Sequence, residues 1–178
     1  MRIILRFRLL IYDMIRTLID FTGKNDKISW YPINDVIMGG RSESNLQVKE
    51  GVARFTGNVS LQNNGGFASV RSESINLNLR EFAGISLTAR GDGKIYKCNV
   101  RTDTAFDGVL YQASFRPQAD KWHKYDLPFT SFIATFRGRE LDPAPPLDTS
   151  RVISIGLMIS EKQAGPFSLE IREISAYR

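Results

Sequence analysis

Residues 90–101 read Arg90-Gly91-Asp92-Gly93-Lys94-Ile95-Tyr96-Lys97-Cys98-Asn99-Val100-Arg101. The first five residues are rich in glycine and aspartate, which is typical of a tight hairpin turn. The residues after the turn alternate between apolar and polar, so a strand would direct Tyr96, Cys98 and Val100 to one face. The polar residues between them would point to the other face. The stretch therefore predicts a β-hairpin whose second strand is buried on one side.

Short runs of the same kind continue in both directions along the chain, with Gly, Asn, Asp or Pro between them. The predicted strands are residues 18–21, 46–48, 52–59, 67–72, 75–79, 84–89, 95–102, 110–115, 123–127, 152–160 and 167–177. No long helical pattern lies among them, and three prolines in residues 141–148 exclude a central strand there. Many short strands without intervening helices predict an all-β fold, an antiparallel β-sandwich or jelly roll.

The first twenty residues have a different period. On a helix, one arc of roughly 100 degrees would hold the polar residues Arg2, Arg6, Asp13, Arg16, Thr17 and Asp20. This pattern predicts a short N-terminal amphipathic helix over about residues 5–18. It divides the chain into a helix (1–17) and a β-sandwich domain (18–178). The apolar face of the helix would either pack on the domain or dock on a membrane or a partner protein.

The length and charge of the chain limit what it can be. Its 178 residues suit a single domain. The net charge is +5, but no run of five or six like charges occurs, so no specific nucleic-acid partner is expected. The longest apolar stretch after Arg8, residues 9–12, is too short for a signal peptide or a transmembrane segment. We therefore expect a cytoplasmic protein that is at most peripheral to a membrane.

Cysteine and histidine each occur once, as Cys98 and His123. One cysteine cannot form an internal disulfide, and the two residues together cannot complete a zinc site. Any Ser-His-Asp or Cys-His mechanism would depend on His123, whose neighbours do not resemble a nucleophile motif. We expect neither a metal nor a cofactor, and no enzymatic activity.

The segment 30–42 is the first candidate for binding. It combines turn-forming and glycine residues with two large apolar side chains, which could present an adaptable contact surface. The alternative is a structural loop that closes one end of the sandwich. The candidate binding residues of this segment are Trp30, Asn34, Asp35, Met38, Gly39, Gly40, Arg41 and Ser42.

A second candidate group lies on the polar face of the predicted strands. Its members are Arg71, Asn99, Arg101 and Gln112. Planar guanidinium and amide groups suit hydroxyls, carboxylates or acidic side chains. No exposed aromatic platform for a sugar ring falls into this set, because Tyr111 is predicted to point inward. The group therefore favours protein recognition over carbohydrate recognition.

Residues 30–44 read Trp30-Tyr31-Pro32-Ile33-Asn34-Asp35-Val36-Ile37-Met38-Gly39-Gly40-Arg41-Ser42-Glu43-Ser44. This motif closely resembles the opening motif of the complex I intermediate-associated protein 30 family. Further motifs of that family are matched, in order and spacing, by residues 65–72, 111–115, 135–139, 154–159 and 165–167. The resemblance covers about residues 18–177, and Arg137, in the motif 135–139, joins the candidate binding residues.

The resemblance implies a galactose-binding-like β-sandwich, similar in shape to carbohydrate-binding modules. It also implies a role, because mitochondrial members of the family act as assembly factors that hold intermediates of respiratory NADH:ubiquinone oxidoreductase. The candidate leader segment, residues 1–20, contains Asp13 and Asp20 and does not resemble a mitochondrial presequence. A bacterial or otherwise non-imported form of the family is therefore expected.

We expect from these observations a noncatalytic, chaperone-like assembly factor that binds a protein client. The candidate clients are subunits of a membrane NADH dehydrogenase-type or related electron-transfer complex, with peripheral membrane contact through the N-terminal helix. The alternative is a carbohydrate or small-ligand binding module of the same fold. An enzyme is the third hypothesis, for which the sequence offers no nucleophile-base pair, metal set or phosphate-binding loop.

Overall fold

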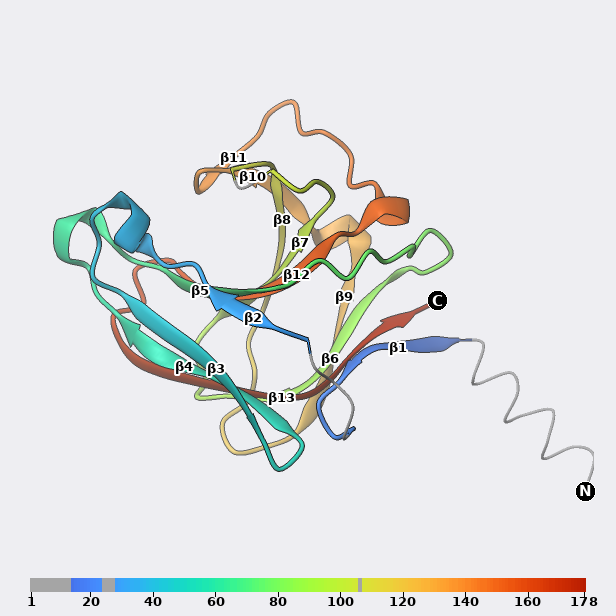
Figure 1. Ribbon diagram of the computed structural model, residues 1–178, viewed down its shortest axis with the longest axis horizontal. Helices are drawn as coiled ribbons and strands as arrows, with labels where there is room; N and C mark the ends of the chain where they lie inside the picture. Colours follow the sequence, from blue (N-terminus) through green and yellow to red (C-terminus); the bar gives the residue numbers. More distant parts are fainter. Residues whose placement is uncertain (1–13, 24–27, 106) are drawn as a thin grey trace, which may run out of the picture.

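The computed structural model describes residues 14–23, 28–105 and 107–178, and for Ile37 and Met38 it describes the backbone alone. It consists of two antiparallel sheets packed as a sandwich (Figure 1). One sheet has six strands in the order β3-β4-β13-β6-β9, with β1 also paired to β13. The other has seven strands in the order β11-β10-β8-β7-β12-β5-β2. The structure confirms the predicted all-β sandwich.

The six-stranded sheet contains β1 (Ile15–Asp20), β3 (Glu43–Lys49), β4 (Val52–Val59), β6 (Gly84–Arg90), β9 (His123–Pro128) and β13 (Gly165–Tyr177). The seven-stranded sheet contains β2 (Trp30–Pro32), β5 (Ala68–Ser72), β7 (Tyr96–Arg101), β8 (Leu110–Phe115), β10 (Ile133–Phe136), β11 (Arg139–Glu140) and β12 (Ser154–Ile159). Four 3-10 turns join them, namely η1 (Asp35–Met38), η2 (Gln62–Asn64), η3 (Phe129–Ser131) and η4 (Thr149–Arg151).

The apolar faces of the two sheets meet in one core. Tyr96, Cys98 and Val100 of β7 are fully buried there, as their alternation predicts. From the other sheet, β13 contributes Leu169 and Ile171, which are also fully buried. Burial of each such side chain stabilises the fold by about 1.5–3 kcal/mol. Because each sheet uses one face for this core, the polar residues of β7 and its neighbours point away from it and are available for a site.

The predicted N-terminal amphipathic helix is wrong for the residues that the structure describes. Residues 15–20 form strand β1, which pairs antiparallel with β13 from Ile15↔Tyr177 to Asp20↔Glu173 (Figure 1). Residues 1–13 lie outside the described residues. The described ranges contain no α-helix, and no helix in them is long and apolar enough to cross a membrane.

The reason for this correction lies in β13. The first half of β13 pairs with β4, and the edge of its second half offers unpaired backbone groups that β1 satisfies. The β-branched residues of β1 also suit a strand. The predicted domain boundary between residues 17 and 18 falls inside this strand. The spacing of residues in the sequence could not reveal the free edge of β13, because only the folded sheet provides it.

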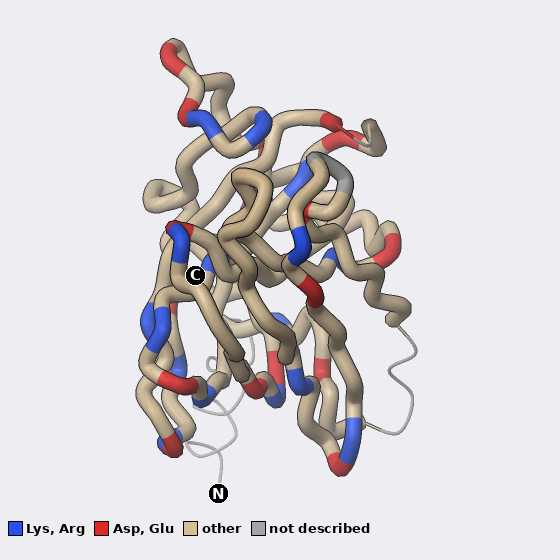
Figure 2. The backbone as a smooth tube through the Cα atoms, turned by 90° about the vertical axis from the view of Figure 1, so that its left-hand side faces the viewer, with Lys and Arg blue, Asp and Glu red and all other residues tan. Residues whose placement is uncertain are grey.

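Charged residues are mixed over the backbone, as the spread of charge in the sequence suggests. Lys and Arg are interspersed with Asp and Glu over the described part of the chain (Figure 2). A concentration of one sign of charge within this mixed surface is therefore informative about a binding site.

The place of β1 in the sandwich gives a first prediction. Replacing Ile19, which is 1% exposed, with Ala should lower the free energy of unfolding by about 2–4 kcal/mol, because the change leaves a cavity. The same change at Ile15, which is 39% exposed, should cost less than about 1 kcal/mol. Chemical denaturation of the two variants measures the difference. Equal losses would contradict the burial of β1 against the core.

Candidate binding cleft

A cleft of about 510 Å³ opens on the face of the seven-stranded sheet that points away from the core. Side chains from β5, β12, β7, β8 and β10 line it, together with the loops that follow β2, β4, β7, β10 and β12. Five sequence-predicted residues are brought together here, namely Arg71, Asn99, Arg101, Gln112 and Arg137, and Asn34 joins them at the border. Strand alternation places Arg71, Asn99, Arg101 and Gln112 on one sheet face, and the strand order makes them neighbours. Arg137 and Asn34 reach the cleft from loops.

The floor of the cleft is a row of residues in register across four strands. Arg71 of β5 is the Cα partner of Gly156 in β12, Gly156 is the partner of Asn99 in β7, and Asn99 is the partner of Gln112 in β8. Gly156 carries no side chain, and an added Cβ would lie 2.8 Å from the Val70 carbonyl oxygen and 3.4 Å from the Asn99 Cβ. A side chain at this position would therefore collide with the backbone of β5, so the close approach of β5 to β12 beneath the cleft requires glycine here.

The amide groups are held in place by hydrogen bonds. Gln112 Nε2 donates to Asn99 Oδ1 at 3.1 Å and lies 3.2 Å from the sulfur of Met158. The hydroxyl of Thr135 lies 3.3 Å from Gln112 Oε1 and donates to the Leu110 carbonyl at 3.0 Å. Because these partners fix the amide planes, the donors and acceptors of the floor are preorganised for a ligand.

Arg101 is the most deeply buried charge of the cleft, with 6% of its surface exposed. Its two terminal nitrogens donate to the carbonyl oxygens of Ala105, at 2.7 Å, and Gly108, at 3.1 Å. Its Nε is buried with no hydrogen-bond partner among the described residues. Arg101 therefore holds the loop after β7 and places a positive charge behind the cleft.

Arg71 is half-buried and lines the cleft directly. Burial, together with repulsion from the nearby charge of Arg101, lowers the pKa of Arg71 to about 10, while Asp103 acts in the opposite direction. Burial likewise lowers the pKa of Arg101, against the opposing effect of Asp103 and Asp107. Arg71 remains protonated at neutral pH because its pKa stays well above 7.

Two ion pairs stand at the rim of the cleft. Lys97 Nζ lies 3.0 Å from Glu161 Oε1, and Arg137 donates to Asp107 Oδ2 from Nε at 2.9 Å and from a terminal nitrogen at 2.6 Å. Arg137 also lies over the ring of Phe136, 5.3 Å from its centroid. Ion pairs that are exposed to solvent contribute only about 0–1 kcal/mol each to stability. A carboxylate of a ligand can therefore compete with Asp107 for Arg137 or with Glu161 for Lys97.

Asp35 fixes the loop at the other border of the cleft. Its carboxylate accepts hydrogen bonds from Ser42 N–H (2.9 Å) and hydroxyl (2.6 Å), Gly66 N–H (2.7 Å) and Phe67 N–H (3.3 Å). Burial would raise the pKa of Asp35, but these hydrogen bonds outweigh that effect and hold the pKa below 3.8. An added Cβ at Gly40 or Gly65 would come within 2.3 or 2.6 Å of this carboxylate, so both positions require glycine.

The other candidates of segment 30–42 lie outside the cleft. Asp35 and Ser42 are each 1% exposed, which places them in the scaffold of the loop. Trp30 is partly buried and packs against Phe21, with the ring centroids 6.1 Å apart. Gly40 is buried, and Gly39 and Arg41 are exposed without lining the cleft. The side chain of Met38 lies outside the described residues.

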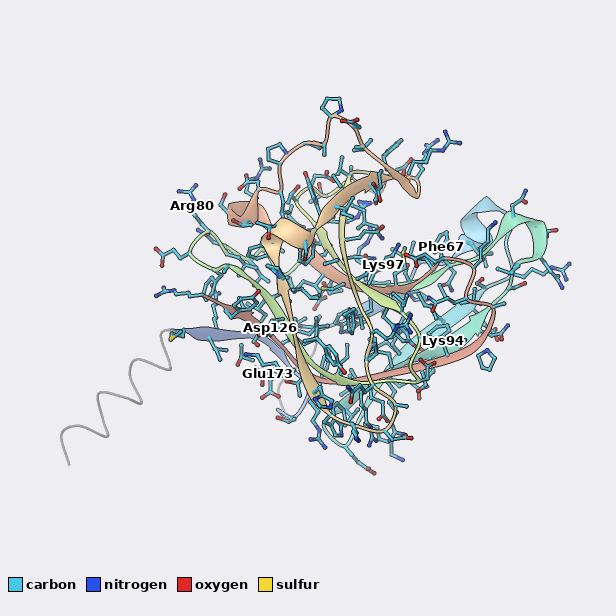
Figure 3. All side chains as sticks on the ribbon, turned by 180° about the vertical axis from the view of Figure 1, so that it is seen from behind. Phe67, Arg80, Lys94, Lys97, Asp126 and Glu173 are labelled. Atoms are coloured by element: carbon cyan, nitrogen blue, oxygen red, sulfur yellow. The ribbon has the colours of Figure 1, made fainter. Side chains whose placement is uncertain are left out.

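Several residues of the cleft were missed by the sequence reasoning. Lys97 and Met158 lie on the polar face of their strands, and their alternation could have placed them there. Phe67 follows the Gly65-Gly66 turn and is an aromatic side chain at the border, labelled beside Lys97 in Figure 3. Ser160 also lines the cleft, and its hydroxyl is buried without a partner among the described residues. The alternation of residues 152–160 puts Ser160 on the same face as Met158, and Phe67 belongs to the family motif 65–72, but neither was named as a candidate.

The antiparallel β-sandwich, with a cleft on the outer face of its seven-stranded sheet, has the galactose-binding-like fold. Residues 19–171 match the family described as Complex I intermediate-associated protein 30 (CIA30), and the chain belongs to this family.

Two similar sequences from animals carry the same name, and a third, from a yeast, does not. The mitochondrial Complex I intermediate-associated protein 30 of Mus musculus is 27% identical, over 94% of this chain and 57% of that protein. The protein of this name from Drosophila melanogaster is 23% identical, over 85% of this chain and 59% of its own length. An uncharacterized protein of Schizosaccharomyces pombe is 30% identical, over 81% of this chain and 75% of that protein. The chain thus spans a little over half the length of its mouse and fly relatives.

Solved structures with the same fold include carbohydrate-binding modules. The family 11 module from Clostridium thermocellum, in complex with a β-1,3-1,4-mixed-linked tetrasaccharide, has a TM-score of 0.63 at 16% identity, covering 92% of this chain and 95% of the module. A mutant of a family 29 carbohydrate-binding module has a TM-score of 0.53 at 10% identity, covering 91% of this chain and 89% of the module. At these identities the likeness shows the fold alone.

The Asp35 carboxylate gives a second prediction. Asp35→Asn should lower the free energy of unfolding by about 2–4 kcal/mol at pH 7, because an amide nitrogen would face N–H donors that lose their acceptor. The pKa of Asp35 is lower in the folded state, so its contribution is present above the unfolded pKa and is lost as the pH falls through the folded value.

Denaturant titrations of the wild type and the variant at neutral pH and at about pH 3 measure this effect. The difference between the two proteins should narrow at the lower pH. Asp120→Asn, at an exposed position, is the control and should change stability by less than about 0.5 kcal/mol. A difference that stayed constant with pH would argue against the ionised carboxylate as the stabilising group.

Proposed function

We propose that this protein is a noncatalytic binding protein that assists the assembly of a membrane NADH dehydrogenase-type or related electron-transfer complex. Its client is a subunit or intermediate of that complex, and the cleft on the seven-stranded sheet is the surface that holds it. The proposed place of action is the cytoplasm beside the membrane in which the complex is assembled.

The observation that carries this proposal is the cleft itself, with preorganised amides and buried arginines, in a chain of the CIA30 family. Groups that recognise carboxylates and amides are expected in a protein that binds part of another protein. The names of the mouse and fly relatives, which associate them with complex I intermediates, support the choice of client.

The positions of the most reactive side chains support a noncatalytic role. His123 lies on β9 in the other sheet, outside the cleft. Cys98 is buried in the core, and burial raises the pKa of its thiol to about 12, so that little thiolate forms at neutral pH. The two residues on which nucleophilic catalysis would most readily depend are therefore not offered to a ligand in the cleft.

Affinity purification from native extract, with mass spectrometry, tests the proposal. The wild type should capture a client, and Arg71→Ala should reduce its recovery about tenfold, because a charged hydrogen-bonding group is removed from the cleft. Arg80→Ala removes an equal charge from an exposed position at the opposite end of the molecule and should leave recovery unchanged (Figure 3).

Thermal unfolding shows whether each variant is folded. The proposal fails if the folded wild type captures no client and deletion of the protein leaves the amount of the NADH dehydrogenase complex unchanged.

A carbohydrate or small-ligand binding module is the second candidate function, and Phe67 is the observation that favours it. An aromatic ring at the border of the cleft can support the face of a sugar ring, while the amides of the floor bind hydroxyls. A thermal-shift panel of neutral oligosaccharides would then reveal saturable binding that Phe67→Ala weakens about tenfold. Absence of any saturable sugar would remove this candidate.

A further inference from the structure

We propose that the cleft binds an extended acidic peptide segment, with one carboxylate of the segment seated on Arg71. This inference rests on the proposed function, because the segment would belong to the protein client. It goes further by assigning the chemistry of the ligand and its principal contact.

The charge of the cleft is the first reason. Five basic and two acidic side chains line it, which gives a local charge of +3. The basic residues are Arg71, Lys97, Arg101, Arg137 and Lys162, and the acidic ones are Asp107 and Glu161. The whole chain carries +5 over 178 residues, so positive charge is concentrated in the cleft well above the average of the surface. Such a field favours an anionic ligand and accelerates its approach.

The second reason is the cost of burying two guanidinium groups side by side. Arg101 is buried with its terminal nitrogens on backbone carbonyls, which are neutral acceptors. The nearby carboxylates of Asp103 and Asp107 favour its charged form, but they do not outweigh its burial. The charge of Arg101 disfavours the protonated form of Arg71, as the direction of the pKa shift shows. A carboxylate on Arg71 would offset this repulsion and form charge-assisted hydrogen bonds.

The rim ion pairs show where further carboxylates of the ligand fit. Lys97 and Arg137 already hold carboxylates, those of Glu161 and Asp107, at hydrogen-bond distance. Both acidic partners are about half exposed, and such pairs are weak. Acidic side chains of a bound segment can therefore take their places at little cost.

The size and lining of the cleft favour a peptide. It spans the five neighbouring strands from β5 to β10, a width of about 19 Å at roughly 4.8 Å between strands, which accommodates about six residues of extended chain. Ile33, Leu110 and Met158 provide apolar contacts between the charges, and the floor amides match a peptide backbone. Phe67 is the one aromatic ring among the described lining residues, whereas sugar sites generally use several.

Binding of defined peptides by the full chain tests the inference. The probe is a fluorescent twelve-residue peptide of alternating Glu and Ser, and the matched control peptide has Gln in place of Glu. The acidic peptide should bind saturably, and the Gln peptide should bind about tenfold more weakly or less well still. Affinity should also fall as the salt concentration rises.

Variants of the protein test whether Arg71 is the residue that contacts the acidic peptide. Arg71→Gln should weaken binding of the acidic peptide about tenfold, and Arg71→Lys should retain part of it, since lysine keeps the charge but loses the planar fork. Arg80→Gln is the control for charge alone and should bind like the wild type. If Arg71→Gln does not fold, the comparison of the two peptides on the wild type decides instead.

Four results would overturn the inference. They are equal binding of the two peptides, absence of saturable binding, equal losses in Arg71→Gln and Arg80→Gln, and tighter binding of an oligogalacturonate, which would indicate a carboxylated sugar. Failure here is distinguishable from failure of the proposed function. Capture of a client that Arg71→Ala abolishes, without acidic peptide binding, would leave the assembly role and remove the acidic ligand. Binding of the acidic peptide without capture of any client would support the acidic ligand and remove the assembly role.

Discussion

One buried carboxylate, that of Asp35, holds together the segments that border the cleft. It accepts hydrogen bonds from Ser42, at the end of its own loop, and from Gly66 and Phe67, at the end of the β4–β5 connection. Glycines 40 and 65 exist because a side chain at either position would collide with this carboxylate. Through Asp35, the motif 30–44 connects two loops that border the cleft. It can affect binding by fixing the positions of Asn34 and Phe67, which line the cleft.

The cleft combines rigidity with an unfavourable accumulation of charge. The amides of Asn99 and Gln112 fix one another, and Arg101 fixes the loop that follows β7. The same burial that makes these groups rigid removes water from two neighbouring guanidinium groups, which the rest of the fold must stabilise. Two neighbouring buried cations lower the stability of the free protein, but they would bind a carboxylate favourably. Such an arrangement is typical of a binding site, where stability is lost in favour of function.

The errors of the sequence reasoning have a common cause. Residues 15–20 fit a helix by spacing, yet they form a strand because β13 offers them a partner edge. Residues 75–79 fit a strand by pattern, yet among them only Leu77 forms a β-bridge, with Val152, because the rest run as a loop along the sheet. β2, β10 and β11 were missed because they are strands of three, four and two residues, too short to show a clear alternation. In each case the deciding hydrogen bonds come from residues distant in sequence.

The sequence by itself determined the β-sandwich, since alternation fixes which side chains a strand buries, and it placed Arg71, Asn99, Arg101 and Gln112 on one polar face. Only the tertiary structure decided that Arg71, Asn99 and Gln112 lie in one row with Gly156 and that Arg101 lies opposite Ser154 beside this row. It also decided that Arg137 joins them from the β10–β11 turn and that Asp35 and Ser42 are buried. The physical reason is that period-two alternation is a local property of the chain. Strand order, register and the packing of loops depend on contacts between segments that the sequence does not place beside one another.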